Sequence, residues 1–204
     1  THPKLIRVDF CFYRCTGRIR DRGHRETKIK LPTAKVVNAA FVLMGVSGSG
    51  KSFIGKSLAK ELECDFIEGD DYHSIQNKAK MAEGIPLTDD DRSAWLQHLR
   101  NMLATSKKPT VLTCSALKKS YREKLSDHEN QTLFIHLKGE TEVIKNRLEG
   151  RAGHFFNPVL LHDQLKTLEG LTTDEIGFSV NIVQGSENII AEIKSRLDDM
   201  ELLK

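Results

Sequence analysis

Residues 45–52 have the types and the spacing that phosphate binding requires. They satisfy the pattern G-x-x-x-x-G-K-[ST]. Glycines let the backbone curl until successive N–H groups point at one phosphate chain. Lys51 can pair with the outer phosphates as a point charge, and the Ser52 hydroxyl can ligate Mg²⁺. The residues expected to hold a nucleotide are Gly45, Val46, Ser47, Gly48, Ser49, Gly50, Lys51 and Ser52.

The flanking sequence also fits this motif. Residues 39–44 form a short apolar run typical of a buried strand, and residues 53–62 repeat apolar side chains at helical spacing. A helix beginning near Lys51 would add the positive end of its dipole to the phosphate site. A chance glycine-rich turn is the alternative, but a strand before the loop and a helix after it favour nucleotide binding.

An acidic cluster, Glu68-Gly69-Asp70, follows the next predicted strand, residues 64–67. Ligands bind at the carboxyl ends of the strands in open α/β sheets. There, Asp70 could accept a hydrogen bond from an acceptor hydroxyl and orient it for attack, and Glu68 could hold Mg²⁺ through water. The alternative is that Asp70 and Asp71 only cap the following helix.

The elements that must position these residues alternate between strand and helix along the chain. Further strands are expected at 110–114, 132–137 and 178–183, and further helices at 74–82, 89–105, 118–125, 141–151, 158–169 and 187–202. This alternation predicts a five-stranded parallel sheet flanked by helices in three layers.

Composition excludes several classes of protein. The 204 residues fit one domain, with 39% hydrophobic and 29% charged residues. No apolar run approaches the ~20 residues of a membrane span. Four cysteines at irregular spacing predict free thiols in a reducing compartment.

The charge is divided unevenly along the chain. Residues 1–40 hold ten Lys or Arg and three Asp or Glu, whereas the other 164 residues hold 21 basic and 25 acidic residues. A mildly acidic body does not suit a nucleic-acid-binding surface. Residues 1–38 are interpreted as a disordered basic leader ahead of a domain at 39–204. We expect a cytoplasmic protein, or a mitochondrial one if the leader is a transit peptide.

Five segments together resemble the gluconokinase family: LMGVSGSGKS, GDDYH, NKAKMAEGIPLTDDDRSAWL, CSALKKSYR and RAGHFF. The resemblance runs from about Phe41 to the end of the chain. It implies a P-loop kinase fold similar to shikimate and nucleoside monophosphate kinases, with a mobile lid at about 147–158. It also implies phosphorylation of D-gluconate at its 6-hydroxyl by ATP with Mg²⁺, a product that enters the pentose phosphate pathway, and a homodimer.

Gluconate carries one carboxylate and five hydroxyls, so its pocket should combine cations with hydrogen-bonding groups. Arg92 and Arg122 are the candidates for the carboxylate, since a guanidinium pairs with it in a bidentate fork. Each cation could instead lie on the surface or cap a helix. The expected substrate-binding residues are Asp70, His73, Asn77, Arg92, Lys118, Lys119 and Arg122.

Two further groups of residues have alternative roles. Asp89, as the cap, with Asp90 and Asp91 in the first turn, would stabilise a helix N-terminus without any catalytic role. Trp95 is expected in the core or in a pocket wall.

The predicted lid carries Arg147, Arg151 and His154, with Gly150 and Gly153 as hinges. Arg151 is expected to stabilise charge on the transferred phosphoryl group and Arg147 to contact the nucleotide, whereas His154 is expected to be structural. Arg147 could alternatively lie on a solvated helix surface.

The sequence departs from the family pattern at Glu68, where Asp is frequent, and the third strand ends in Cys114-Ser115 with no carboxylate for a second metal site. A kinase for another small hydroxy acid, such as shikimate, is the nearest alternative function. A nucleotide-binding module without catalysis is the other, although Lys51, Ser52 and Asp70 together favour an enzyme.

Overall fold

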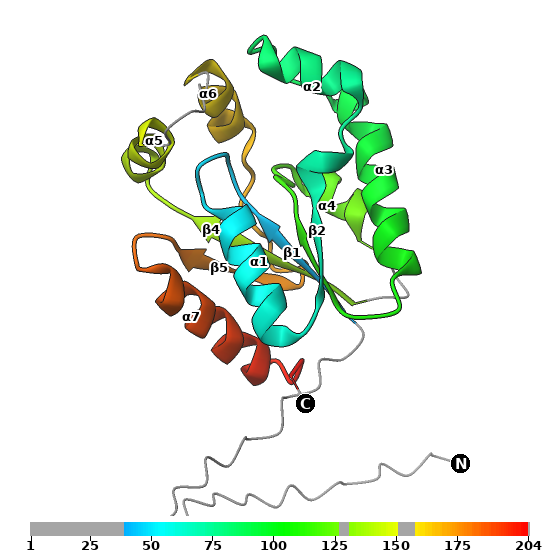
Figure 1. The fold of residues 1–204 in the computed structure, drawn as a ribbon, viewed down its shortest axis with the longest axis vertical. Coiled ribbons are helices and arrows are strands. Elements are labelled where there is room, and N and C mark those ends of the chain that lie inside the picture. The colour runs from blue at the N-terminus through cyan, green and yellow to red at the C-terminus, as the bar shows by residue number, and fades with distance from the viewer. Residues whose placement is uncertain (1–38, 127–130, 151–157, 204) are drawn as a thin grey trace, which may run out of the picture. The chain divides into compact units, whose positions relative to one another are not determined.

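A central sheet of five parallel strands organises the described residues, 39–126, 131–150 and 158–203, in the computed structural model (Figure 1). The strand order is β2-β3-β1-β4-β5. The strands are β1 (Ala39–Met44), β2 (Asp65–Glu68), β3 (Thr110–Thr113), β4 (Gln131–Lys138) and β5 (Gly177–Asn181). Every residue of β1 is buried, because β1 lies at the centre of the sheet and helices cover both faces.

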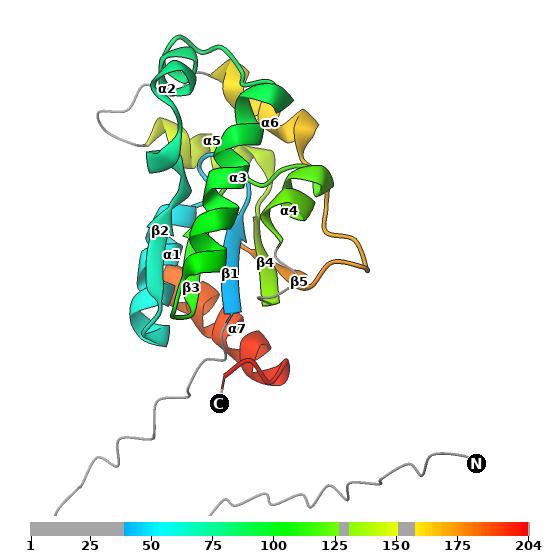
Figure 2. The ribbon, with the colours of Figure 1, turned by 90° about the vertical axis from the view of Figure 1, so that its right-hand side faces the viewer.

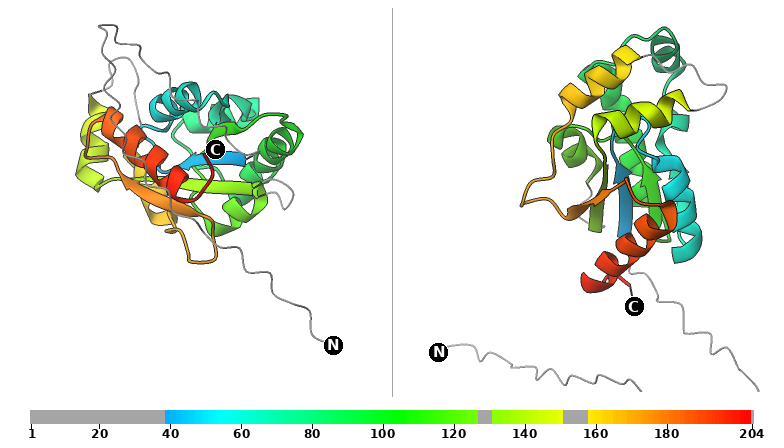
Figure 3. Two further views of the ribbon diagram at one scale, coloured as in Figure 1. Left: turned by 90° about the horizontal axis from the view of Figure 1, so that it is seen from below. Right: turned by 90° about the vertical axis from the view of Figure 1, so that its left-hand side faces the viewer.

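Seven α-helices and one 3₁₀ helix accompany the strands within the described part of the chain. They are α1 (Lys51–Leu62), η1 (Gly69–Tyr72), α2 (Ile75–Ala82), α3 (Asp89–Thr105), α4 (Lys119–Leu125), α5 (Thr141–Glu149), α6 (Pro158–Thr167) and α7 (Ser186–Asp199). Figure 2 shows α3 in front of the sheet, and the right-hand view of Figure 3 shows α1, α5 and α7 on the other side.

Alternate residues of β1 contribute to two separate cores. Phe41 and Leu43 pack in one cluster with side chains of α1, α5 and α7. Val42 and Met44 pack in the other with side chains of α3 and α4. Successive side chains of a strand point to opposite faces, so one fully apolar strand joins both layers to the sheet.

The parallel arrangement brings several chemically important segments to one edge. The phosphate loop follows β1, η1 follows β2, and Ser115 lies two residues after β3. Figure 1 shows α2 and α6 at this same end of the molecule, above the carboxyl ends of the strands. The site is therefore built where open α/β sheets bind ligands.

The predicted fold class is confirmed, and the predicted strands and helices are all present with ends shifted by a few residues. The short helix η1 was not predicted. The alternative role for Asp70 and Asp71 is wrong, because the Ser74 side chain caps α2 by accepting from the Asn77 backbone N–H at 3.1 Å. Asp70 and Asp71 lie in η1 instead.

The predicted cap of α3 also needs correction. Thr88 is the cap, not Asp89: its hydroxyl accepts from the Asp91 backbone N–H, while the Asp91 carboxylate accepts from the Thr88 N–H at 2.9 Å. This reciprocal pair is a capping box, which satisfies two helix-end donors at once.

Residues 1–38, 127–130, 151–157 and 204 lie outside the described residues, and with them the basic leader and most of the predicted lid. No helix in the described ranges is long and apolar enough to cross a membrane.

Candidate active site

The phosphate loop depends on glycine at defined positions. Gly48 has φ +82°, and a Cβ there would lie 2.7 Å from Cγ of Leu148 on α5. Gly50 has φ +97° and is the N-cap residue of α1. Side chains are strained at such backbone angles, so glycine is required for the loop to curl between β1 and α1 and to pack against α5.

Two cations lie against this loop. The Lys51 ammonium donates to the backbone carbonyls of Gly45, at 3.0 Å, and Val46, at 3.1 Å. Arg147 of α5 donates from Nη2 to the Ile182 carbonyl at 2.5 Å and from Nη1 to the Ser49 carbonyl at 3.5 Å. Arg147 is therefore not a solvated surface residue. Its guanidinium bridges the end of β5 and the phosphate loop.

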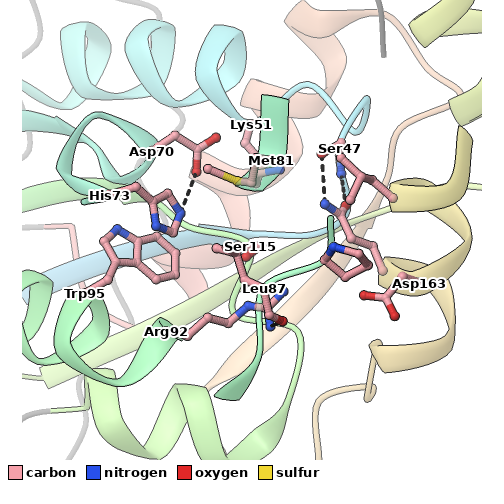
Figure 4. A pocket seen from close by; sticks show the side chains of 13 residues that line it. Ser47, Lys51, Asp70, His73, Met81, Leu87, Arg92, Trp95, Ser115 and Asp163 are labelled. Carbon is pink, nitrogen blue, oxygen red and sulfur yellow. Dashed lines mark hydrogen bonds and ion pairs between the residues drawn. The ribbon is translucent and has the colours of Figure 1, made fainter. Parts of the chain in front are cut away.

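Asp70, His73 and Trp95 form one wall of a pocket that opens beside Lys51 (Figure 4). The Trp95 indole N–H donates to the Gly69 carbonyl at 2.8 Å, and the His73 ring stacks on the indole at 3.9 Å between centroids. His73 Nε2 lies 4.0 Å from Asp70 Oδ1. Trp95 is 4% exposed and thus belongs to the core and to the pocket wall at once.

His73 and Asp70, the two titratable side chains of this wall, differ in charge and in exposure. Burial lowers the pKa of His73 below its usual 6.5, against an opposing effect of the Asp70 carboxylate, so the imidazole is neutral at neutral pH. The Asp70 side chain is 68% exposed at the pocket opening. A neutral imidazole beside an accessible carboxylate suits hydroxyl groups, because both can accept hydrogen bonds from them.

Arg92 of α3 brings a positive charge into the pocket. Its Nη1 donates to the carbonyl of Leu87 and, at 3.4 Å, to that of Thr88, and its guanidinium lies 5.6 Å from the Tyr121 ring centroid. Two of the described residues that line the pocket are Lys or Arg, namely Lys51 and Arg92. Arg92 therefore adds a positive charge to the pocket beside that of Lys51.

Helix α6 supplies the opposite wall, which sequence reasoning missed. Leu160, Asp163 and Gln164 line the pocket, and Gln164 accepts from the Ser47 N–H at 2.7 Å. The helix itself was predicted, but nothing in its sequence indicated which face meets the phosphate loop. Other lining residues without a predicted role are Met81, Pro86, Leu87 and Ser115. For Ser115, its place just after a strand was an available signal.

The structure corrects the prediction that Arg122 binds a substrate carboxylate. Arg122 is 0% exposed and does not line the pocket. Its guanidinium pairs with Glu175, with Nε–Oε1 at 2.5 Å and Nη2–Oε2 at 3.0 Å. It also donates to the carbonyls of Ala116, Leu117, Glu169 and Gly170. Arg122 therefore ties α4 to the segment between α6 and β5.

Three more predicted substrate residues have partners elsewhere. Asn77 is buried, and its side-chain amide donates to the Asp91 carbonyl at 2.8 Å, which joins α2 to α3. Lys118 pairs with Asp89 at 2.8 Å, and Lys119 pairs with Asp174 at 2.7 Å. None of the three lines the pocket. These contacts join parts of the scaffold, and the role of the three side chains in substrate binding stays a prediction.

The predicted metal residues, Ser52 and Glu68, lie on different elements, α1 and β2. Ser52 lies in the first turn of α1, next to Lys51. The Glu68 carboxylate instead accepts a hydrogen bond from the Thr113 hydroxyl across β2 and β3, and Glu68 does not line the pocket. Among the described residues, no three His, Cys, Asp or Glu side chains come together as a metal site. Arg151 and His154 lie outside the described residues.

A five-stranded parallel sheet with a phosphate loop facing an acceptor pocket defines the class of P-loop kinases. The family model for shikimate kinase matches residues 47–178. The chain is 38% identical over 180 residues to a probable gluconokinase of Xenopus tropicalis, covering 79% of this chain and 95% of the relative. It belongs to the gluconokinase family.

Two other proteins agree with this assignment. The thermoresistant gluconokinase of Escherichia coli K12 is 43% identical over 155 residues, which cover 74% of this chain and 89% of that protein. The solved gluconokinase from Sinorhizobium meliloti 1021 superposes with a TM-score of 0.74 at 43% identity, covering 80% of this chain and 93% of that one. The chain is accordingly an ATP-dependent kinase.

Proposed function

We propose that this kinase transfers the terminal phosphoryl group of ATP to the 6-hydroxyl of D-gluconate, giving ADP and 6-phospho-D-gluconate. The observation that carries the proposal is the pocket itself. It brings Asp70 and Arg92 to the same opening as Lys51 of the phosphate loop, in a chain of the gluconokinase family. A hydroxy acid needs this pair of groups, a carboxylate for the reacting alcohol and a cation for its acid end.

On the nucleotide side, the N–H groups of the loop and the α1 N-terminus hold the phosphates. Lys51 now donates to two carbonyls of its own loop, and these are the bonds it would exchange for phosphate oxygens. Arg147 lies against the Ser49 carbonyl, close enough to the loop to add positive charge there. Arg151, outside the described residues, stays a prediction for the same task.

On the acceptor side, Arg92 is the proposed partner of the gluconate carboxylate. Asp70 would accept the proton of the 6-hydroxyl as that oxygen attacks phosphorus, and its exposure leaves it accessible to a ligand. His73 is neutral, so it would form a hydrogen bond with a substrate hydroxyl, as donor or as acceptor, and would not attract the substrate carboxylate. Trp95, held by its bond to Gly69, keeps that imidazole in place.

Mg²⁺ is the proposed metal, and the residues present fit it in one respect. The Ser52 hydroxyl, at the start of α1, would hold the ion together with the nucleotide's own phosphates and water, as Mg²⁺ prefers. When bound, the ion neutralises charge on the phosphates. Glu68 is not part of the proposed Mg²⁺ site, because its carboxylate accepts a hydrogen bond from the Thr113 hydroxyl.

An acceptor panel tests the proposed function. ADP release is measured with gluconate, shikimate and other sugar acids at saturating Mg-ATP, and the phosphorylated product is identified by its mass and by the position of the phosphate. Turnover with gluconate at least tenfold above the other acids is expected. Turnover with a different acid alone would refute the substrate assignment, and ATP binding without turnover on any acceptor would favour a non-catalytic module.

Two further expectations from the family follow the same proposal. The product would enter the pentose phosphate pathway, and the chain would form a homodimer. Sedimentation of the purified protein, at concentrations bracketing those of the assay, tests the dimer directly.

A further inference from the structure

Gln164 of α6 holds the third residue of the phosphate loop at two points. Its side-chain carbonyl accepts from the Ser47 backbone N–H at 2.7 Å, and its amide nitrogen donates to Ser47 Oγ at 3.1 Å. The dashed lines at Ser47 in Figure 4 mark these bonds. They join residues 117 positions apart in the chain, so they link two separate parts of the site.

Helix α6 makes limited apolar contact with the rest of the protein: Leu161 is buried, and Leu165 packs partly buried against the same core cluster. Among the side chains described for α6, Leu161 alone is fully buried, at 4% exposed, whereas Val159 is 59% exposed. Apolar burial is the main source of attachment for most helices. The two bonds of Gln164 add to this packing and join the pocket-lining face of α6, with Leu160 and Asp163 on it, directly to the phosphate loop.

We propose that Gln164 is a positioning residue for phosphoryl transfer. By locking α6 to Ser47, it keeps the acceptor wall against the phosphate loop, so that the acceptor hydroxyl is aligned and water is kept out. If α6 moves away, a water molecule can attack the terminal phosphorus of ATP, which yields ADP and inorganic phosphate in place of phosphorylated acceptor. This inference rests on the proposed kinase reaction.

Gln164→Leu tests the proposal, because leucine is of similar size but makes no hydrogen bond. The measurement is the ratio of ADP released to acceptor phosphorylated, determined separately on the same samples. Wild type is expected to give a ratio near one. The variant is expected to give a clearly higher ratio and an acceptor turnover lower by about tenfold, since two hydrogen bonds together account for roughly 5- to 150-fold.

A double-mutant cycle with Ser47→Ala shows whether the two residues act through each other. Ser47→Ala keeps the backbone N–H bond and loses only the hydroxyl contact, so its own effect should be smaller than that of Gln164→Leu. In the Gln164→Leu background it should have almost no further effect. Equal losses in both backgrounds would overturn the proposal.

His162→Leu is the matched control, because His162 is exposed on the same helix. It should leave the product ratio and the turnover as in wild type. The proposal is overturned if Gln164→Leu gives the wild-type ratio of ADP released to acceptor phosphorylated. This holds also if its turnover is lower only because part of the protein is unfolded. If wild type fails with gluconate, the proposed function fails alone, and the ratio is then measured with whichever acceptor of the panel is phosphorylated.

Discussion

Replacing Arg122 by methionine removes a guanidinium that is 0% exposed and paired with Glu175, whose side chain is 9% exposed. Four backbone carbonyls lose a donor in the same change. Removing one partner of a buried ion pair costs about 3–5 kcal/mol, because the other charge is left without compensation. At about 2–4 °C per kcal/mol for a chain of this size, the melting temperature should fall by roughly 6–20 °C.

Arg92→Met should behave in the opposite way. A charge-assisted hydrogen bond contributes about 1.5–3 kcal/mol, so losing the proposed carboxylate contact should raise the KM for gluconate by roughly 10- to 150-fold. Its effect on the melting temperature should be much smaller than that of Arg122→Met, because Arg92 lines an open pocket. The KM for ATP should stay within about twofold of wild type.

Both variants are assayed by urea unfolding and by initial rates at a temperature where each is fully folded. Combining Arg122→Met with Glu175→Leu should recover part of the lost stability, because no unpaired charge then stays buried. An Arg122→Met protein as stable as wild type but with a raised gluconate KM would refute the assignment of the two arginines.

Three other perturbations test the remaining chemistry. Lys51→Ala should lower turnover by several orders of magnitude, and chelation of Mg²⁺ should abolish it reversibly, both measured by ADP release. Asp70→Asn should lower kcat by about 10²–10⁴-fold with the equilibrium affinity for ATP unchanged, and an equal loss of ATP binding would contradict its acceptor role. Burial lowers the pKa of His136 from 6.5 to about 4, so the unfolded chain binds the proton more readily. Stability from this group is complete above pH 6.5 and is lost as the pH falls toward 4, by about 3 kcal/mol. In urea unfolding between pH 7 and pH 4, the free energy of unfolding should fall less for His136→Phe than for wild type, by about 3 kcal/mol.

The phosphate side could be predicted from the sequence because its determinants are local. The apolar run Ala39–Met44, the glycines and the helix at Lys51 are neighbours in the chain, and the structure has β1 at those same residues. The parallel sheet followed from the alternation of strands and helices for the same reason. Ser47 was included as a phosphate-loop residue, but its side-chain partner was not foreseen.

The two arginines show where local patterns stop being informative. Arg92 and Arg122 both lie in polar stretches of predicted helices, and the charged residues around each do not reveal which of the two is buried. The partner that buries Arg122 is Glu175, 53 residues further along the chain. Only the folded position of that segment reveals that one arginine is structural while the other meets the pocket.

The phosphate loop and the pocket walls should differ in how they tolerate substitutions. Single substitutions at the glycines of the phosphate loop should disrupt it. A Cβ at Gly48 would clash with Leu148, and Gly50, the N-cap residue of α1, has a left-handed backbone. The pocket walls come from η1, α3 and α6, and we expect their side chains to contact the acceptor. Substitutions at Arg92 or Asp163 should therefore change which acid is accepted while nucleotide affinity stays constant. Gln164 differs from both, because its bonds belong to the two sides at once.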